Sequence, residues 1–260
     1  TPKPSSAASD VYKRQVAQVV VPFMAAAYII AAVVILILNY KAIPGAVVEI
    51  VQSAFGMRAV AGGALGAMML AMQKGIARGI FSNEAGIGSA PIAAAAVQTT
   101  EPVRQGLVSM LGTVIDTIII CTMTGLSIVI TGSWDKGLEG VAVTTRAFQV
   151  GLPFPAKVSA FILMLCLVFF AFTTILGWDY YSERCLDYLT GNNQKVVRAY
   201  RWIYIACVFI GPYMTVSAVW TIADIVNGLM AIPNLIALLA LNGVVVALSL
   251  IHISEPTRPE

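Results

Sequence analysis

The chain has 260 residues, of which 58% are hydrophobic and only 11% are charged, and its mean hydropathy is +0.84. Soluble domains carry roughly a quarter charged residues, so this composition excludes a soluble or disordered chain and predicts one whose solvent is lipid. Sixteen Lys and Arg against thirteen Asp and Glu leave a net charge of +3 without a basic cluster, which excludes nucleic acid as a partner. The single histidine, His252, lies in a polar tail, and the four cysteines are scattered. Histidine-based catalysis and a transition-metal site are therefore not expected.

Five apolar stretches are long enough to cross a bilayer, which takes about twenty residues at about 1.5 Å each. They are 16–38, 106–132, 158–178, 202–223 and 225–251. Pro212 and Pro233 interrupt the last two, where we expect kinks rather than helix ends. With the broken segment described below, the pattern predicts an all-α polytopic membrane protein with about six transmembrane helices, one of them discontinuous.

The segments between the first two spans do not make a clean crossing. Residues 43–55 place apolar side chains at helical spacing beside Glu49 and Gln52, which predicts an amphipathic helix at the membrane interface. The apolar pieces 59–73 and 85–100 are each too short to cross alone and are separated by KGIARGIFSNE. They form either one discontinuous helix with an unwound centre or a polar loop between two re-entrant pieces, and composition alone does not decide between these.

Residues 81–91, FSNEAGIGSAP, are the most informative part of the chain. Gly86 and Gly88 tolerate backbone angles that a helix forbids, and Ser82, Asn83 and Ser89 can hydrogen-bond the freed backbone groups. Non-helical backbone at membrane depth is tolerated only where it is buried in protein or lines an aqueous cavity. The break therefore marks a candidate binding site.

A second half-helix is expected after the break. Pro91 suits a first helical turn capped by Ser89 or Ala90, and IAAAAV would continue the helix. The positive end of that half-helix would then favour an anionic group of a ligand.

Polar side chains inside the other spans are further candidates. Asp116, next to Thr117, lies ten residues into its span and should meet a cation, a donor or water; the alternative is a structural ion pair with Arg78 or Lys74. Thr173 and Thr174 offer hard oxygen ligands for a small cation, although threonines also hydrogen-bond to their own helix. Trp178 and its neighbours Tyr180 and Tyr181 are typical of an interfacial aromatic belt, and Asp224 with Asn227 is typical of a contact between helices.

Four segments in order resemble the sodium:alanine symporter family, the amino-acid carrier proteins of bacteria and archaea. They are RGIFSNEAGIGSAPIAAAA, PVRQGLVSMLGTVIDTIIICTMTGL, AFTTILGWDYYSERC and DIVNGLMAIPNLIALLAL. The resemblance covers roughly 16–249 and implies part of a LeuT-type (APC-like) fold. It also implies residence in a bacterial or archaeal plasma membrane, with 179–201 in the cytoplasm and 133–157 outside.

The resemblance also implies the site residues. A family member is longer and carries a GTGN-type broken helix in its first half, which this chain lacks, so the chain is similar to the second half of a carrier. The implied substrate-binding residues are Ser82, Asn83, Glu84, Gly86, Ile87, Gly88, Ser89 and Trp178. The implied cation-binding residues are Thr173 and Thr174, with Asp116 and Thr117 as a weaker second set.

The two ends, 1–15 and 250–260, do not resemble the family and are similar to translated sequencing-adapter read-through. They are excluded from the reasoning about fold. The alternative is a pair of ordinary juxtamembrane tails.

The expected function is sodium-driven symport of a small neutral amino acid such as alanine or glycine, with sodium as coupling ion and no other cofactor. The first alternative is proton coupling, with Glu84 or Asp116 as the titrating group. A channel is disfavoured because no ring of pore carboxylates is visible. A membrane enzyme is disfavoured because the spans hold neither a histidine-based site nor a pair of catalytic acids.

Overall fold

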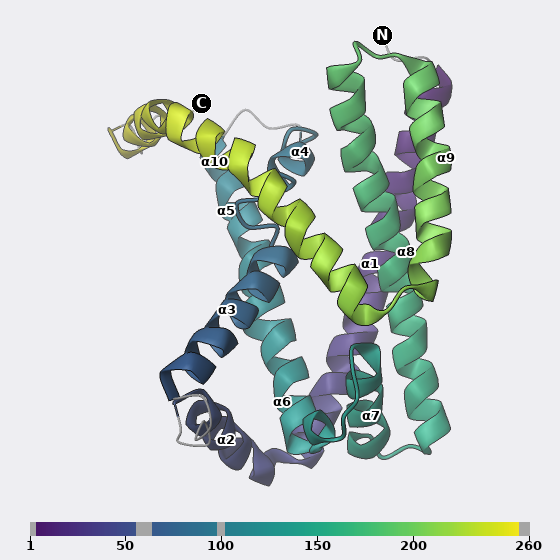
Figure 1. Ribbon diagram of the computed structural model, residues 1–260, viewed down its shortest axis with the longest axis vertical. Coiled ribbons are helices and arrows are strands. Elements are labelled where there is room, and N and C mark those ends of the chain that lie inside the picture. Colours follow the sequence, from purple (N-terminus) through teal and green to yellow (C-terminus); the bar gives the residue numbers. More distant parts are fainter. Residues whose placement is uncertain (1–3, 56–63, 98–101, 255–260) are drawn as a thin grey trace. The chain divides into compact units, whose positions relative to one another are not determined.

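The computed structural model describes residues 4–55, 64–97 and 102–254, and every regular element in these ranges is a helix (Figure 1). The all-α prediction is confirmed. The chain divides into two compact units. The first unit comprises Thr1–Met68 and Ile120–Val216, and the second comprises Met69–Ile119 and Ser217–Glu260.

The helices are distributed between the two units as follows. The first unit contains α1 (Pro4–Leu38), α2 (Ile43–Phe55), α6 (Thr122–Ile130), α7 (Val141–Gly151), α8 (Ala156–Leu189) and α9 (Gln194–Ile210). The second contains most of α3 (Ala64–Ser82), α4 (Ala90–Ala94), α5 (Pro102–Thr113) and α10 (Val216–Ser254). A π-helical segment, Val114–Cys121, follows α5 and includes the boundary between the units.

Four helical stretches among the described residues are long and apolar enough to cross a membrane. They are Val19–Leu38, Val103–Ile130, Ala156–Leu189 and Val216–Ala247. Their outward side chains are largely apolar, as Phe23, Phe161 and Leu239 illustrate, because lipid rather than water is their solvent. The chain is therefore a multi-pass membrane protein.

The predicted span 202–223 is wrong as a single helix. Gly211 and Pro212 stand side by side, and they are the two residue types that least favour a helix interior. α9 therefore ends at Ile210, a 3₁₀ turn covers Gly211–Tyr213, and the chain is extended at Met214 before α10 begins. Pro233, by contrast, lies inside α10, whose helix continues past it as expected.

The predicted helix 43–55 is confirmed as α2 (Ile43–Phe55). Pro44 stands in its first turn, where the missing N–H of proline costs no helical hydrogen bond.

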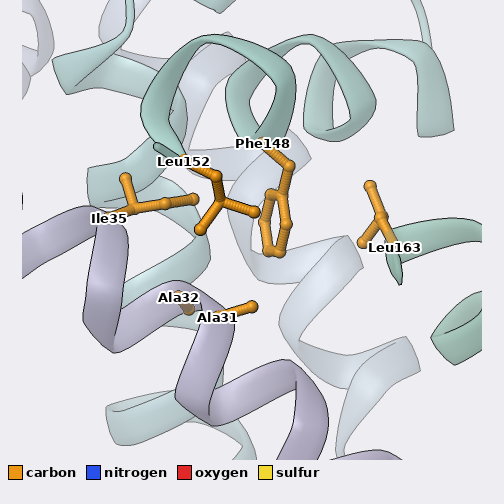
Figure 2. Packing of buried hydrophobic residues seen from close by; sticks show 6 residues of the cluster. All are labelled: Ala31, Ala32, Ile35, Phe148, Leu152 and Leu163. Carbon is orange, nitrogen blue, oxygen red and sulfur yellow. The ribbon is translucent and has the colours of Figure 1, made fainter. Parts of the chain in front are cut away.

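The first unit is built around a small apolar core (Figure 2). Its buried members come from α1, from the end of α7 and from α8: Ala31, Ala32, Ile35, Phe148, Leu152 and Leu163. The alanines let the helices approach closely. Gly151 does the same, because a Cβ at this position would lie 2.7 Å from Cγ2 of Ile35.

Polar contacts support this core. The ring of Tyr28 stacks on Phe148 with 5.5 Å between centroids, and its hydroxyl lies 2.6 Å from Oγ1 of Thr124 on α6. The phenolic oxygen is thereby satisfied inside an apolar bundle, where an unpaired hydroxyl would be costly.

α8 and α9 form a helical hairpin, side by side in Figure 1. Arg201 of α9 donates from Nε to Oε1 of Glu183 on α8, and Glu183 is only 1% exposed. Tyr204 of α9 donates its hydroxyl to the carbonyl of Ile175, at 2.9 Å. The sequence pattern does not predict this ion pair, because the two residues belong to different helices.

Candidate functional site

The helix break predicted at the two glycines is present in the second unit. α3 ends at Ser82 and α4 begins at Ala90, and we call residues 83–89 between them the break. Gly86 and Gly88 have φ values of +75° and +89°, which lie in the left-handed region that glycine enters without steric cost. Glu84 also has a positive φ, +50°, and a side chain there costs about 1–2 kcal/mol.

The start of the break follows from how α3 ends. The N–H of Ala85 donates to the carbonyl of Ile80 at 3.0 Å, and the N–H of Glu84 donates to that of Phe81 at 3.4 Å. This pair of bonds around one left-handed residue is a Schellman motif, with Glu84 in the place that glycine usually takes. Asn83 adds a bond from Nδ2 to the carbonyl of Gly79, at 3.1 Å. The carbonyls of Gly79, Ile80 and Phe81 are thus satisfied without a continuing helix.

The structure corrects the expected length of both halves around the break. α3 runs through KGIARGIF, so Lys74 and Arg78 lie on a helix and not on an unwound connector. The helix continues because Gly75 and Gly79 cost only about 1 kcal/mol each, and the residues between them favour helix.

α4 is only five residues long, with tight i to i+3 bonds at Ala96 and Val97 after it. The expected half-helix over IAAAAV is therefore wrong in length. A single turn of helix sums too few peptide dipoles to carry the anion-binding role expected of its first turn.

Ser89 stands immediately before α4, but it does not cap the helix with its side chain. It is 1% exposed, and its Oγ has no hydrogen-bond partner among the residues that the structure describes. Ile87, its neighbour across Gly88, is 2% exposed. The break thus buries one polar atom that is free to bind a ligand.

Four of the sequence-predicted site residues meet where the break begins. Ser82 donates its hydroxyl to Oδ2 of Asp116. Asn83 donates from Nδ2 to Oγ1 of Thr117 at 2.7 Å. The hydroxyl of Thr117 in turn donates to Oδ1 of Asn83 at 3.0 Å. Asp116 and Thr117 belong to the π-helical segment, a type of local widening that is frequent at functional sites.

The alternative of an ion pair between Asp116 and Arg78 is wrong, because Arg78 pairs with another acid. Nη1 and Nη2 of Arg78 donate to Oδ1 and Oδ2 of Asp224 on α10, both at 3.1 Å. The guanidinium lies 3.7 Å from the ring centre of Trp220, whose ring meets that of Phe81 edge to face at 5.4 Å. Asp224 therefore joins two helices, as the sequence predicted, while Asp116 accepts from Ser82.

α10 also reaches the break itself. Nδ2 of Asn234 donates to the carbonyl of Gly86 at 2.9 Å, and a Cβ on Gly88 would lie 3.2 Å from Cβ of Asn234. Asn234 was not among the predicted site residues. Its signal in the sequence is a polar residue directly after Pro233, but Asn227 and Asn242 are polar residues of the same span and give no less of a signal.

The remaining predicted site residues lie on α8, in the first unit. Oγ1 of Thr173 donates to the carbonyls of Phe169 and Phe170, at 3.0 Å each, and Thr174 is exposed. A threonine hydroxyl that donates to its own helix keeps lone pairs that can ligate a cation. Trp178 meets Tyr181 edge to face, with 5.7 Å between centroids.

Comparisons with known proteins define the class. The family model of the sodium:alanine symporter family matches residues 13–252. The chain is 54% identical to an uncharacterized transporter of Haemophilus influenzae, over 88% of this chain and 50% of the relative. It is 47% identical to the sodium/alanine symporter AgcS of Methanococcus maripaludis, over 88% and 49%. It is 39% identical to the probable sodium/glutamine symporter GlnT of Bacillus subtilis, over 89% and 47%.

The chain is a multi-pass helical membrane protein whose relatives are named as transporters and symporters. More particularly, the chain belongs to the sodium:alanine symporter family. It spans about half the length of the curated relatives that it matches.

Proposed function

We propose that this chain is the second half of a sodium-coupled symporter of LeuT type, which takes a small neutral amino acid into a bacterial or archaeal cell across the plasma membrane. Family membership supports the class of transport. The observation that carries the proposal is the break, because it combines left-handed turns at Gly86 and Gly88 with a buried, unpartnered hydroxyl on Ser89.

Residues 82–89 would contribute one half of the amino-acid site, and a broken helix in the other half of the carrier would supply the rest. Ser89 Oγ and the unwound backbone would bind the charged ends of the zwitterion. Glu84 keeps a strained left-handed conformation where glycine would be unstrained, and such strain tends to persist at functional sites. We therefore assign its carboxylate to the same site.

Sodium would bind to hydroxyls of Thr173 and Thr174 on α8. Asp116 and Thr117 form a weaker candidate for a second cation, because Ser82 and Asn83 already occupy part of their bonding capacity. Binding of sodium would favour the conformation that holds the substrate, and the ion gradient would thereby drive uptake. The alternative coupling ion is a proton carried by Glu84 or Asp116.

The coupling ion can be tested with the full-length carrier that contains this sequence, reconstituted in liposomes. We expect alanine uptake to rise with an inward sodium gradient and to be insensitive to a pH gradient at fixed sodium. Unlabelled glycine should compete, and glutamine should be included because one relative is named for it. Uptake that follows the pH gradient and ignores sodium would contradict sodium coupling and favour the proton alternative.

A further inference from the structure

We propose that Asn234 is a positioning residue for the substrate site: from α10 it holds the unwound backbone at Gly86 and Gly88 in the shape that binds the amino acid. The inference rests on the proposed function for its consequence in transport. Its structural part concerns contacts within the second unit alone.

Two separate contacts place Asn234 on the break. Its Nδ2 donates to the carbonyl of Gly86 at 2.9 Å. A Cβ built on Gly88 would lie 3.2 Å from Asn234 Cβ and 3.3 Å from its Cγ and Oδ1. One side chain therefore bonds the first left-handed glycine and packs closely against the second.

The bond answers a need created by the break. The carbonyl of Gly86 lies outside any helix, so no residue four positions further on donates to it as in a continuous span. An unsatisfied carbonyl is costly where water is scarce, and a neighbouring helix is the usual source of a substitute donor. Because a carbonyl only accepts, the amide nitrogen of Asn234 must face it, which leaves Oδ1 beside Gly88.

A second contact fixes α10 against α3 at some distance from Asn234. Asp224 accepts the two hydrogen bonds from Arg78. Asp224 lies ten residues before Asn234 on α10, which corresponds to a rise of about 15 Å along the helix. Trp220 stacks on the same guanidinium. α10 thus holds the helical part of α3 at one point and the break at another. Asn234 accordingly determines the shape of the turn and does not merely follow it.

The first test measures this positioning without any transport. Hydrogen–deuterium exchange is compared between the full-length carrier and its Asn234→Ala and Asn234→Asp variants. We expect peptides covering 83–89 to exchange about 10-fold faster in both variants, since an ionised aspartate cannot donate to the Gly86 carbonyl. Peptides from α8 and α9 should be unchanged. Unaltered exchange over 83–89 would overturn the proposal, as would an equal increase across the whole protein.

Asn227→Ala is the matched control. Asn227 lies seven residues before Asn234, hence on nearly the same face of α10, and no hydrogen bond between it and the break is seen among the described residues. We expect the Asn227→Ala variant to exchange the amides of 83–89 at the same rate as the unaltered carrier. An increase like that of Asn234→Ala would overturn the assignment to Asn234 in particular.

The second test links the contact to transport. We expect Asn234→Ala to raise the KM for alanine about 10-fold while the maximal rate changes less than twofold, and Asn227→Ala to change neither. A merely structural role would lower the amount of folded carrier and leave KM unchanged, which would overturn the positioning role. Changed exchange in a carrier that shows no sodium-dependent uptake at all would instead sustain the contact and contradict the proposed function.

Gly88→Ala provides an independent check on the same contact. Its Cβ would crowd Asn234, so removing Cγ and Oδ1 with Asn234→Ala should relieve part of the damage. We expect the loss of uptake in the double variant to be smaller than the product of the two single losses. A double variant whose losses multiply would show that the two residues act separately and would contradict the inference.

Discussion

Replacing Arg201 with methionine is expected to lower the free energy of unfolding by about 1–3 kcal/mol. The substitution removes one charged donor from Glu183, which is only 1% exposed, whereas the Arg201 side chain is 44% exposed and stays in contact with solvent. Weaker compensation of a buried carboxylate costs more than the small net gain from forming the pair. The apparent melting temperature of the purified carrier in detergent measures the effect.

Arg198→Met is the matched control for this prediction, because Arg198 is an exposed arginine on the same helix. Arg198→Met should change the free energy of unfolding by no more than about 0.5 kcal/mol, as most surface substitutions do. Adding Glu183→Gln to Arg201→Met should recover much of the loss, since a neutral amide costs less to bury than a carboxylate. An Arg201→Met variant with the same apparent melting temperature as the unaltered protein would contradict a stabilising role for the Arg201–Glu183 pair.

The second large effect is expected in transport. Changing Thr173 and Thr174 together to valine removes two hydroxyls and leaves the shape of α8 almost unaltered. If these oxygens bind the coupling ion, the apparent sodium affinity should fall about 10- to 100-fold, in line with the loss of hydrogen bonds or ligand contacts to a charged partner. Alanine uptake measured against sodium concentration gives this value.

Thr145→Val serves as the control, because Thr145 donates to the carbonyl of Val141 as Thr173 donates to its own helix, and it lies on α7. Its sodium dependence should equal that of the unaltered carrier. Unchanged sodium affinity in the double valine variant would remove the cation role from α8.

The elements that the sequence predicted well are those fixed by local physics. Positive φ at Gly86 and Gly88 follows from residue type, and the helical spacing in 43–55 is enough to define α2. The π-helical segment around Asp116 was missed because its apolar pattern, VIDTIIIC, is equally compatible with an ordinary α-helix.

The contacts that complete the site could not be predicted in the same way. Arg78 meets Asp224 across 146 positions, and Gly86 meets Asn234 across 148. Such pairings depend on which helices are neighbours and on their rotation, neither of which the pattern along one chain specifies. The same reason explains why Arg78 was a plausible but wrong partner for Asp116.

The end of α9 shows a further reason. Pro212 and Pro233 were both expected to kink their helices, yet α9 ends just before Pro212 while α10 continues past Pro233. Gly211 precedes Pro212, and the two together cost more free energy inside a helix than an interruption does. Hydropathy alone does not detect it.

The most direct test of the proposed site is protection of the break by its substrate. Ser82→Cys places a thiol on an exposed position where the break begins, in a carrier whose Cys121, Cys166, Cys185 and Cys207 are replaced. Glu139→Cys, exposed in the connection between α6 and α7 and outside the candidate spans, is the control. We predict that alanine with sodium slows labelling of Cys at 82 by a small methanethiosulfonate reagent several-fold. The effect should vanish when choline replaces sodium, and labelling at 139 should be unaffected. Labelling at 82 that is indifferent to alanine, or that falls equally at both positions, would contradict the assignment of the break as the amino-acid site.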